Sequence, residues 1–158
     1  EALGAGGLIA AFVLGVILGA LVNRSGDHGG GVRVLLAVSA MLALAALLGG
    51  MGAPALAVGL MAAAMGAENS VFRRNGDVSF GVTSMTGALV KLGQGLAAAL
   101  TGGPRLGWAP YLILWAGLVI GAWAGASVFA LFHLASVWFA AGAAAVLAFA
   151  MSRMAPPD

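Results

Sequence analysis

The chain has 158 residues, of which 62% are hydrophobic and only 8% are charged, and its mean hydropathy is +1.07. A soluble domain carries roughly 25% charged residues, so this composition excludes an ordinary water-facing surface and indicates a protein that lies in a bilayer. The net charge of +2 comes from scattered residues that form no basic stripe for nucleic acid. The chain contains no Cys, which excludes disulfides, thiolate metal sites and cysteine catalysis.

A membrane-spanning helix needs roughly 20 apolar residues, so the length leaves room for about six spans and no separate soluble domain. The sequence therefore predicts an all-α fold, with residues 1–158 forming a single polytopic transmembrane helical bundle. A membrane β-barrel would show strands that alternate polar and apolar residues, whereas the apolar runs here are continuous. The expected segments are 4–22, 32–48, 54–72, 79–100, 108–132 and 134–151.

Two of these segments are interrupted. The purely apolar part of 54–72 is too short to span alone, so a spanning helix must continue through Glu68 to about Phe72. Residues 73–77 (RRNGD) indicate a hydrated turn, because Asn-Gly is a strong local turn signal. The fourth segment is the least apolar, and each of its glycines weakens a helix by about 1 kcal/mol relative to Ala. That helix could be broken or locally unwound.

Glycines recur every four residues in the first and fifth segments, which allows close approach of neighbouring helices. The helix-packing residues predicted in this way are Gly15, Gly19, Gly117, Gly121 and Gly125. Such faces also suit a homo-oligomer. The pattern Gly-x-x-x-Gly-Ala occurs at 15–20 and again at 121–126, each time followed by a purely apolar segment. If these mark an internal repeat, the first half lacks the equivalents of the third and fourth segments, which we would expect before Glu1.

Basic residues indicate an orientation. If all six segments cross, the connection 23–31, the turn 73–77 and the junction at His133 share one side of the membrane. That side carries Arg24, Arg33, Arg73 and Arg74, and the other side carries Arg105 and Arg153. The positive-inside rule then places the four-arginine side in the cytoplasm and both chain ends outside.

The motif Gly66-x-x-Asn69, followed by Thr83-x-x-Thr86-Gly87, resembles the YoaK family of bacterial multi-pass membrane proteins of unknown function. That family typically shows a Gly-x-Gln-Asn-Ala stretch and then a Thr-Thr-x-x-Thr-Gly stretch that opens the next helix. The Gly-x-x-x-Gly-Ala pattern of the first segment looks like the family's preceding helix. The resemblance covers essentially the whole chain and implies a location in the bacterial inner membrane.

The chain departs from the family pattern in two ways. Glu68 stands where the family usually has Gln. The family usually also has an N-terminal helix pair with an acidic residue and a Thr-Gly-Asn motif, which this sequence lacks. We expect that the missing helix pair would lie before Glu1. The resemblance leaves the activity open, because the family has no established reaction.

Polar side chains concentrate where the third segment ends and the fourth begins. Ionisable groups inside a bilayer cost about 2.5–3.5 kcal/mol each, so they tend to be paired or to line a cavity. Lys91 lies roughly 16 Å into its helix and Glu68 roughly 6 Å into its own. The axial gap of about 10 Å is too long for a direct salt bridge unless the lysine snorkels. The candidate substrate-binding residues are Glu68, Asn69, Thr83, Thr86, Gly87, Lys91 and Gln94.

The sequence leaves two functions open. In a small-solute or ion transporter, glycine-interrupted helices expose backbone dipoles to a substrate. Asn69, Thr83 and Thr86 would then supply uncharged ligands, and Glu68 would carry a coupling proton or cation. In a structural or assembly protein, the hydroxyls would bond back to helix carbonyls, Asn69 would cap its helix, and Lys91 would be paired.

An enzymatic function is not expected. His133 and Ser136 are three residues apart, but no acidic residue is close to them in sequence to complete a nucleophile and base arrangement. No cofactor or metal is expected, since His28 lies in a polar loop without convergent partners. The predicted partner is the lipid bilayer.

Overall fold

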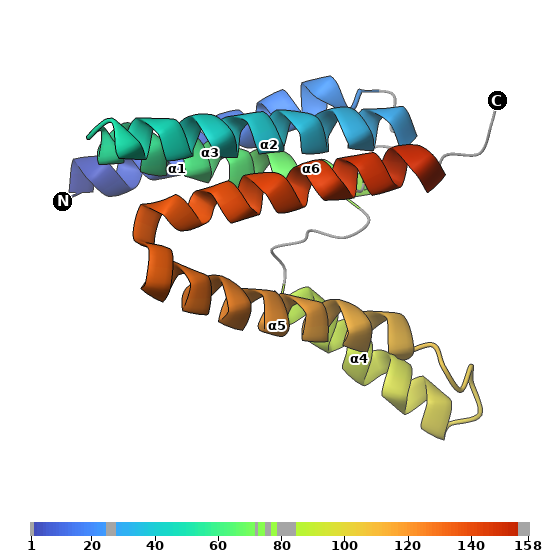
Figure 1. Cartoon of the computed structure of the whole chain (residues 1–158). Coiled ribbons are helices and arrows are strands. Elements are labelled where there is room, and N and C mark those ends of the chain that lie inside the picture. The colour runs from blue at the N-terminus through green and yellow to red at the C-terminus, as the bar shows by residue number, and fades with distance from the viewer. Residues whose placement is uncertain (1, 25–27, 72, 75–76, 79–84, 155–158) are drawn as a thin grey trace. The chain divides into compact units, whose positions relative to one another are not determined.

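The computed structural model describes residues 2–24, 28–71, 73–74, 77–78 and 85–154. Within them the regular secondary structure is helical apart from one hairpin of two-residue strands, which confirms the all-α prediction (Figure 1). In chain order the elements are α1 (Ala2–Val22), α2 (His28–Gly50), α3 (Pro54–Glu68), β1 (Arg73–Arg74), β2 (Asp77–Val78), α4 (Met85–Leu100), α5 (Ala109–Phe132), η1 (His133–Ser136) and α6 (Val137–Met154).

Three stretches of the described chain are long and apolar enough to cross a bilayer, namely Gly4–Val22, Gly29–Gly50 and Ala109–Met154. The third stretch contains both α5 and α6, and the 3₁₀ helix η1 separates them at His133, where φ is 49°. Helices α3 and α4 have 15 and 16 residues. A spanning helix uses roughly 17–25 residues, so these two fall short of a full span.

Two helix boundaries differ from the prediction. Helix α2 begins at His28, so Gly29–Gly31 and Arg33 are helical and not part of the preceding loop. The Arg33 Nε group donates to the Gly29 carbonyl oxygen one turn earlier, at 3.1 Å. Helix α3 ends at Glu68 and not near residue 72, and Asn69 occupies its C-cap.

The C-terminal end of the described chain is also more helical than predicted. Arg153 lies in the last turn of α6, where a cation is favoured by the helix dipole, and not in a polar tail. Its Cζ atom lies 4.9 Å from the ring centroid of Phe149. The predicted Asn-Gly turn at 75–76 is outside the described residues, but the flanking strands pair antiparallel, Arg73 with Val78 and Arg74 with Asp77.

The chain forms two compact units. The first unit is Glu1–Gly81 with Phe132–Asp158, and the second is Val82–Leu131. The first unit contains α1, α2, α3 and α6, in which α3 packs against α1 and α2, while α6 packs against α2. The second unit contains α4 and most of α5.

Helices α1 and α3 run parallel and touch through their backbones. A Cβ atom added to Gly15 would overlap the backbone of Ala63. One turn further along, a Cβ at Gly19 would lie 2.6 Å from the Ala67 carbonyl oxygen. Both contacts join residues 48 positions apart (63 − 15 and 67 − 19), so the two helices keep one register along this face.

Helix α6 runs antiparallel to α2, and three contacts fix its direction. At one end, a Cβ on Gly31 would lie 3.2 Å from the Met151 Cε atom. In the middle, the Ser39 hydroxyl donates to the Ala141 carbonyl oxygen at 2.8 Å. At the other end, the Leu134 side chain of η1 lies against Gly49.

The packed interior of the first unit consists of small residues. One cluster of buried side chains contains Val34, Leu35, Val38, Ala64, Ala67, Val71, Ala144 and Ala148, and a second contains Ala45, Ala46, Ala57 and Val137. Alanine and valine let helix axes approach closely, which is how membrane helices gain van der Waals contact. The first cluster contains residues near the end where α3 and α6 finish, and the second contains residues near the end where they start.

The first unit therefore has two distinct ends, which Figure 1 shows at the right and left of the four helices. We call the end where α1, α3 and α6 finish and α2 begins the arginine end, because it carries Arg24, Arg33 and Arg153. We call the other the turn end; it contains the α2–α3 turn at residues 51–53 and η1. The six-crossing prediction placed the His133 junction on the side of the 23–31 connection. The packing of η1 against the end of α2 shows that this was wrong.

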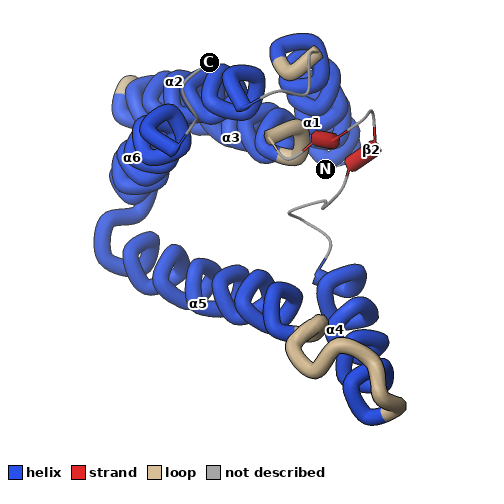
Figure 2. Tube along the Cα trace, turned by 90° about the vertical axis from the view of Figure 1, so that its right-hand side faces the viewer, coloured by secondary structure: helices blue, strands red, loops and turns tan. Residues whose placement is uncertain are grey.

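The second unit is a helix pair joined by residues 101–108. The backbone of Trp108 lies against Gly95, where an added Cβ would be 2.9 Å from the Trp108 Cα atom. The ammonium group of Lys91 lies 5.8 Å from the ring centroid of Tyr111. Helix α5 thus begins beside the middle of α4, as Figure 2 shows.

Candidate functional site

The predicted substrate-binding residues are distributed over both units. Glu68 and Asn69 belong to the first unit, whereas Thr86, Gly87, Lys91 and Gln94 belong to the second. Thr83 lies outside the described residues.

The first set, Glu68 and Asn69, lies at the C-terminal end of α3. Asn69 closes the helix as its C-cap, and its Nδ2 group donates to the Met65 carbonyl oxygen at 2.9 Å. Glu68 is half-buried, and its carbonyl oxygen accepts from the Val71 N–H at 3.0 Å. A carboxylate in the last turn of a helix opposes the helix dipole by about 0.3–1 kcal/mol. Local helix stability therefore does not account for an acid at this position.

Two buried polar residues at the same end of the first unit were not predicted from the sequence. Asn23 and Ser70 are 2% and 3% exposed. The Asn23 Nδ2 group donates to the Ser70 carbonyl oxygen at 2.6 Å and so joins the ends of α1 and α3. Among the described atoms, the Asn23 Oδ1 oxygen is buried and accepts no hydrogen bond. Buried side-chain acceptors usually find a donor, so this oxygen needs an explanation.

The sequence did contain one signal for this pair. Asn23 follows an apolar run of 19 residues directly, and Ser70 follows Asn69 of the family motif. Only the parallel packing of α1 on α3 brings the two together, and helix propensity does not predict which helices will be neighbours.

The second set lies on an amphipathic helix. Gly87, Lys91 and Gln94 are spaced four and three apart, which places them on one stripe of α4. The opposite stripe of the same helix carries Leu89, Leu92, Leu96 and Leu100. In the other helices of the chain, apolar residues surround the axis more evenly. Helix α4 therefore separates water-preferring from lipid-preferring side chains.

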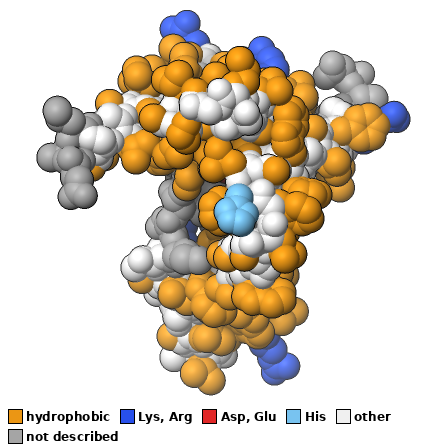
Figure 3. All heavy atoms as spheres, turned by 60° about the vertical axis from the view of Figure 1, so that its left-hand side comes forward, with side chains coloured by type: hydrophobic (Ala, Val, Ile, Leu, Met, Phe, Trp, Pro, Cys, Tyr) orange, Lys and Arg blue, Asp and Glu red, His pale blue; other side chains and the backbone are white. Residues whose placement is uncertain are grey.

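The outer surfaces of the helices are apolar. Hydrophobic side chains cover most of the surface visible in Figure 3. Large side chains such as Trp123 and Leu131 are 74% and 76% exposed. Exposed apolar area of this extent is unfavourable in water and suits lipid.

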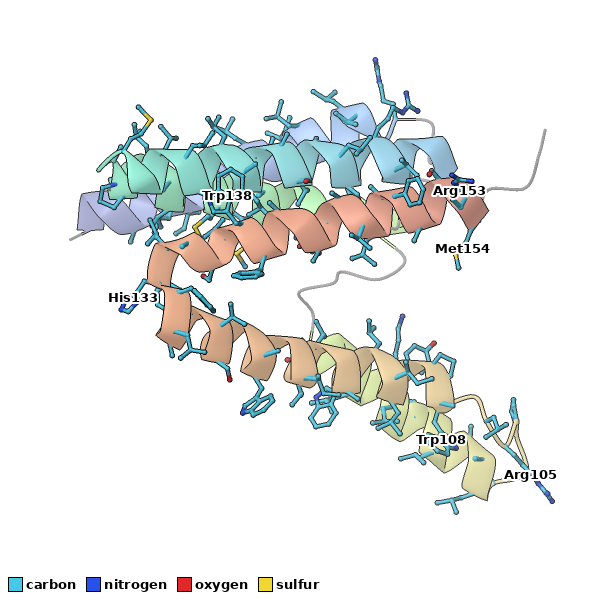
Figure 4. The ribbon with its side chains drawn as sticks, in the orientation of Figure 1. Arg105, Trp108, His133, Trp138, Arg153 and Met154 are labelled. Atoms are coloured by element: carbon cyan, nitrogen blue, oxygen red, sulfur yellow. The ribbon has the colours of Figure 1, made fainter. Side chains whose placement is uncertain are left out.

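Charged groups of the first unit gather at one end. Arg24, Arg33 and Arg153 are all exposed and lie at the arginine end, and β1 (Arg73–Arg74) begins two residues after Val71 in the sequence. The described turn end contains His133 but no Lys or Arg. Figure 4 shows Arg153 and His133 at opposite ends of α6.

Within the described residues, no group of three or more His, Cys, Asp or Glu side chains could hold a metal ion. His133 is exposed and Ser136 is half-buried, both on η1. The chemistry available to the described site is therefore hydrogen bonding by Asn23, Ser70 and Asn69, together with the single carboxylate of Glu68.

The fold and surface together define an integral membrane protein built from apolar helices, with a small polar site at one end of a close-packed unit. The chain belongs to the DUF1275 family of proteins of unknown function, whose family model matches residues 1–150. The resemblance to YoaK proteins agrees with this family. No match was found in the comparison with curated proteins or in the comparison with solved structures.

Proposed function

We propose that this protein is a multi-pass protein of the bacterial inner membrane that moves a small solute or ion. The observation that carries the proposal is the buried Asn23 carboxamide, whose Oδ1 oxygen lacks a donor among the described atoms, one residue away from the end of an apolar helix. An unmade hydrogen bond at a buried acceptor costs about 1–3 kcal/mol. A bound cation or hydrogen-bond donor would remove that penalty.

Groups at the same end of the unit suit such a ligand. Side-chain amide and carboxylate oxygens coordinate hard cations, and Asn23 and Glu68 supply one of each at the arginine end. The half-buried Glu68 carboxylate would carry the coupling proton or cation. Thr83, Thr86, Gly87, Lys91 and Gln94 of the second unit stay substrate-binding residues proposed from the sequence.

The orientation follows from the arginines. Short connections rich in Lys and Arg stay in the cytoplasm, so the arginine end faces the cytoplasm and the turn end faces outward. The internal repeat stays a prediction, supported by the fact that α1 with α2 and α5 with α6 both place a glycine-striped helix before a mostly apolar one.

Ion flux into proteoliposomes tests this function. Purified protein in liposomes is exposed to a proton or Na⁺ jump, and the current is recorded on a supported membrane. Glu68→Gln should abolish the current, and Asn23→Ala should reduce it at least tenfold. Ser127→Ala is the matched control, because that hydroxyl only bonds back to Trp123 within α5.

The proposal fails if wild-type protein gives no current for either ion, or for a panel of small polar solutes, while its helical spectrum is native. It also fails if Glu68→Gln and Lys91→Ala lower only the stability and leave the flux per folded molecule unchanged.

A second candidate is an assembly role, and one observation favours it. Gly117, Gly121 and Gly125 form a small-residue face on α5, and no described atom lies within 4 Å of a Cβ placed on any of them. Such a face suits another copy of the chain in a homo-oligomer. A Gly121→Leu variant should then dissociate a dimer in detergent, and a wild-type monomer would contradict this role. Neither candidate function uses nucleic acid, a cofactor or catalysis.

A further inference from the structure

The first unit restricts how the chain can cross the membrane. Helix α3 ends at the arginine end, since the Asn23 side chain donates to the Ser70 carbonyl oxygen there. Helix α6 starts at the turn end, where Leu134 lies against Gly49. Residues 72–132 therefore begin on one side of the bilayer and finish on the other, so they must cross it an odd number of times.

Helix α5 is suited to make that crossing. It has 24 residues, or about 36 Å at 1.5 Å per residue, and lies within an apolar stretch long enough to span. Its last residue, Phe132, joins η1 directly at the turn end. The start of α5 at Ala109, together with the preceding Trp108 and Arg105, would then lie at the arginine side.

We infer that α4 does not cross the membrane and instead lies in the membrane interface on the arginine side. If both α4 and α5 crossed, the number of crossings between α3 and α6 would be even, which the first unit excludes. Helix α4 separates a Lys91–Gln94 stripe from a leucine stripe. Helices that lie flat at a bilayer surface have this distribution, with the apolar stripe in the acyl region and the polar stripe toward water and headgroups.

The distribution of arginines supports the inference independently. Six crossings would divide the arginines four to two. The five crossings inferred here place Arg105 on the side of all the others, which are Arg24, Arg33, Arg73, Arg74 and Arg153. The positive-inside rule favours the second arrangement, and the rule was not used to count the crossings.

The inference changes the setting of the family motif. Thr86 and Gly87, in the first turn of α4, would lie at the cytoplasmic surface and not at the membrane middle. Lys91 would also be at that surface, so no ionisable side chain of α4 would need burial in lipid. This inference requires membrane insertion of the first unit but does not require transport.

Labelling of single cysteines tests it, because the natural chain has no Cys. Leu106→Cys reports on the α4–α5 connection, Met154→Cys marks the arginine end, and Met51→Cys marks the turn end; these positions are 71%, 78% and 80% exposed. Each variant is first labelled in detergent to show that its thiol reacts. A membrane-impermeant maleimide is then added to inside-out and to right-side-out vesicles.

We expect Leu106→Cys and Met154→Cys to label at least tenfold faster in one kind of vesicle than in the other, and to share that preference. Met51→Cys should label at least tenfold faster in the opposite kind of vesicle. Thr101→Cys is a second reporter if Leu106→Cys does not fold. Labelling of Leu106→Cys together with Met51→Cys would overturn the inference. Within α4, Gln94→Cys should react and Leu96→Cys should be protected. Equal protection of both would also overturn it, because the helix would then be buried.

Discussion

The same glycine pattern occurs on α1 and on α5, and the structure uses it differently in the two helices. On α1, Gly15 and Gly19 lie directly against the backbone of α3. On α5, the positions Gly121 and Gly125 have no described atom within 4 Å of an added Cβ. The pattern therefore gives a helix the capacity for close approach, and a partner helix decides whether that capacity is used.

Helix α3 offers that partner. Its facing residues are themselves small, and at Gly66 an added Cβ would overlap the carbonyl oxygen of Phe12 on α1. Each helix thus contributes glycines to the same contact. Small residues on both sides let two backbones touch, which is the arrangement that drives association in lipid.

The largest expected effect comes from filling the α1 face. Gly15→Ala places a methyl group into the backbone of Ala63, which cannot move as a flexible side chain can. Overpacking of this kind costs about 1–3 kcal/mol. The change in the free energy of unfolding is measured by adding dodecyl sulfate to the protein in detergent micelles and monitoring the loss of helix by circular dichroism.

The matched variant in α5 should change the free energy of unfolding in the opposite direction and stabilise the protein. Gly121→Ala meets open space, and Ala is favoured over Gly in a helix by about 1 kcal/mol. A destabilising effect of similar size in both variants would show that the two faces are equally packed, and the comparison would be wrong.

An intermediate effect is expected at the end of the α1–α3 contact. Asn23→Ala removes the hydrogen bond to the buried Ser70 carbonyl oxygen but also removes the buried Oδ1 oxygen. We expect a net loss of about 1 kcal/mol in the free energy of unfolding, measured in the same detergent titration. A variant that is more stable than wild type would show that the buried Oδ1 oxygen costs more than the hydrogen bond to Ser70 contributes, and would contradict this expectation.

The smallest effect is expected between α2 and α6. Ser39→Ala removes the hydroxyl that donates to Ala141 across the two helices. Hydrogen bonds between membrane helices contribute about 0.6 kcal/mol on average, so the loss should be of that size. Ser127→Ala, whose hydroxyl bonds within α5, should change stability less. Equal changes in the two variants would mean that the interhelical bond has no separate contribution.

Local sequence patterns predicted the helices more successfully than their arrangement. The continuous apolar run over 4–22 predicted α1 closely, and the apolar residues of 108–132 predicted α5. Helix α2 begins earlier than expected because Gly31 packs against Met151 and Val71, and this tertiary contact outweighs the poor helix propensity of glycine. Neighbours in space decide such boundaries, and a single sequence does not name them.

In the candidate site, too, local sequence patterns indicated some residues, whereas others depend on neighbours in space. Glu68 and Asn69 were found from the sequence because they are polar residues near the end of an apolar helix. Asn23 was passed over as the first residue of a polar connection, since its burial depends on Ser70, 47 positions away. The direction of α6 was also mispredicted, because it follows from contacts with α2 such as the Ser39–Ala141 hydrogen bond.

The arrangement of the first unit, with α6 antiparallel to α2, is the claim on which the orientation and the number of crossings both rest. The most direct test compares Met51→Cys with Met154→Cys, at opposite ends of that unit, for labelling by an impermeant reagent in vesicles of known sidedness. We predict that the two thiols react from opposite sides of the membrane. Reaction of both from the same side, as six crossings would require, would contradict the account.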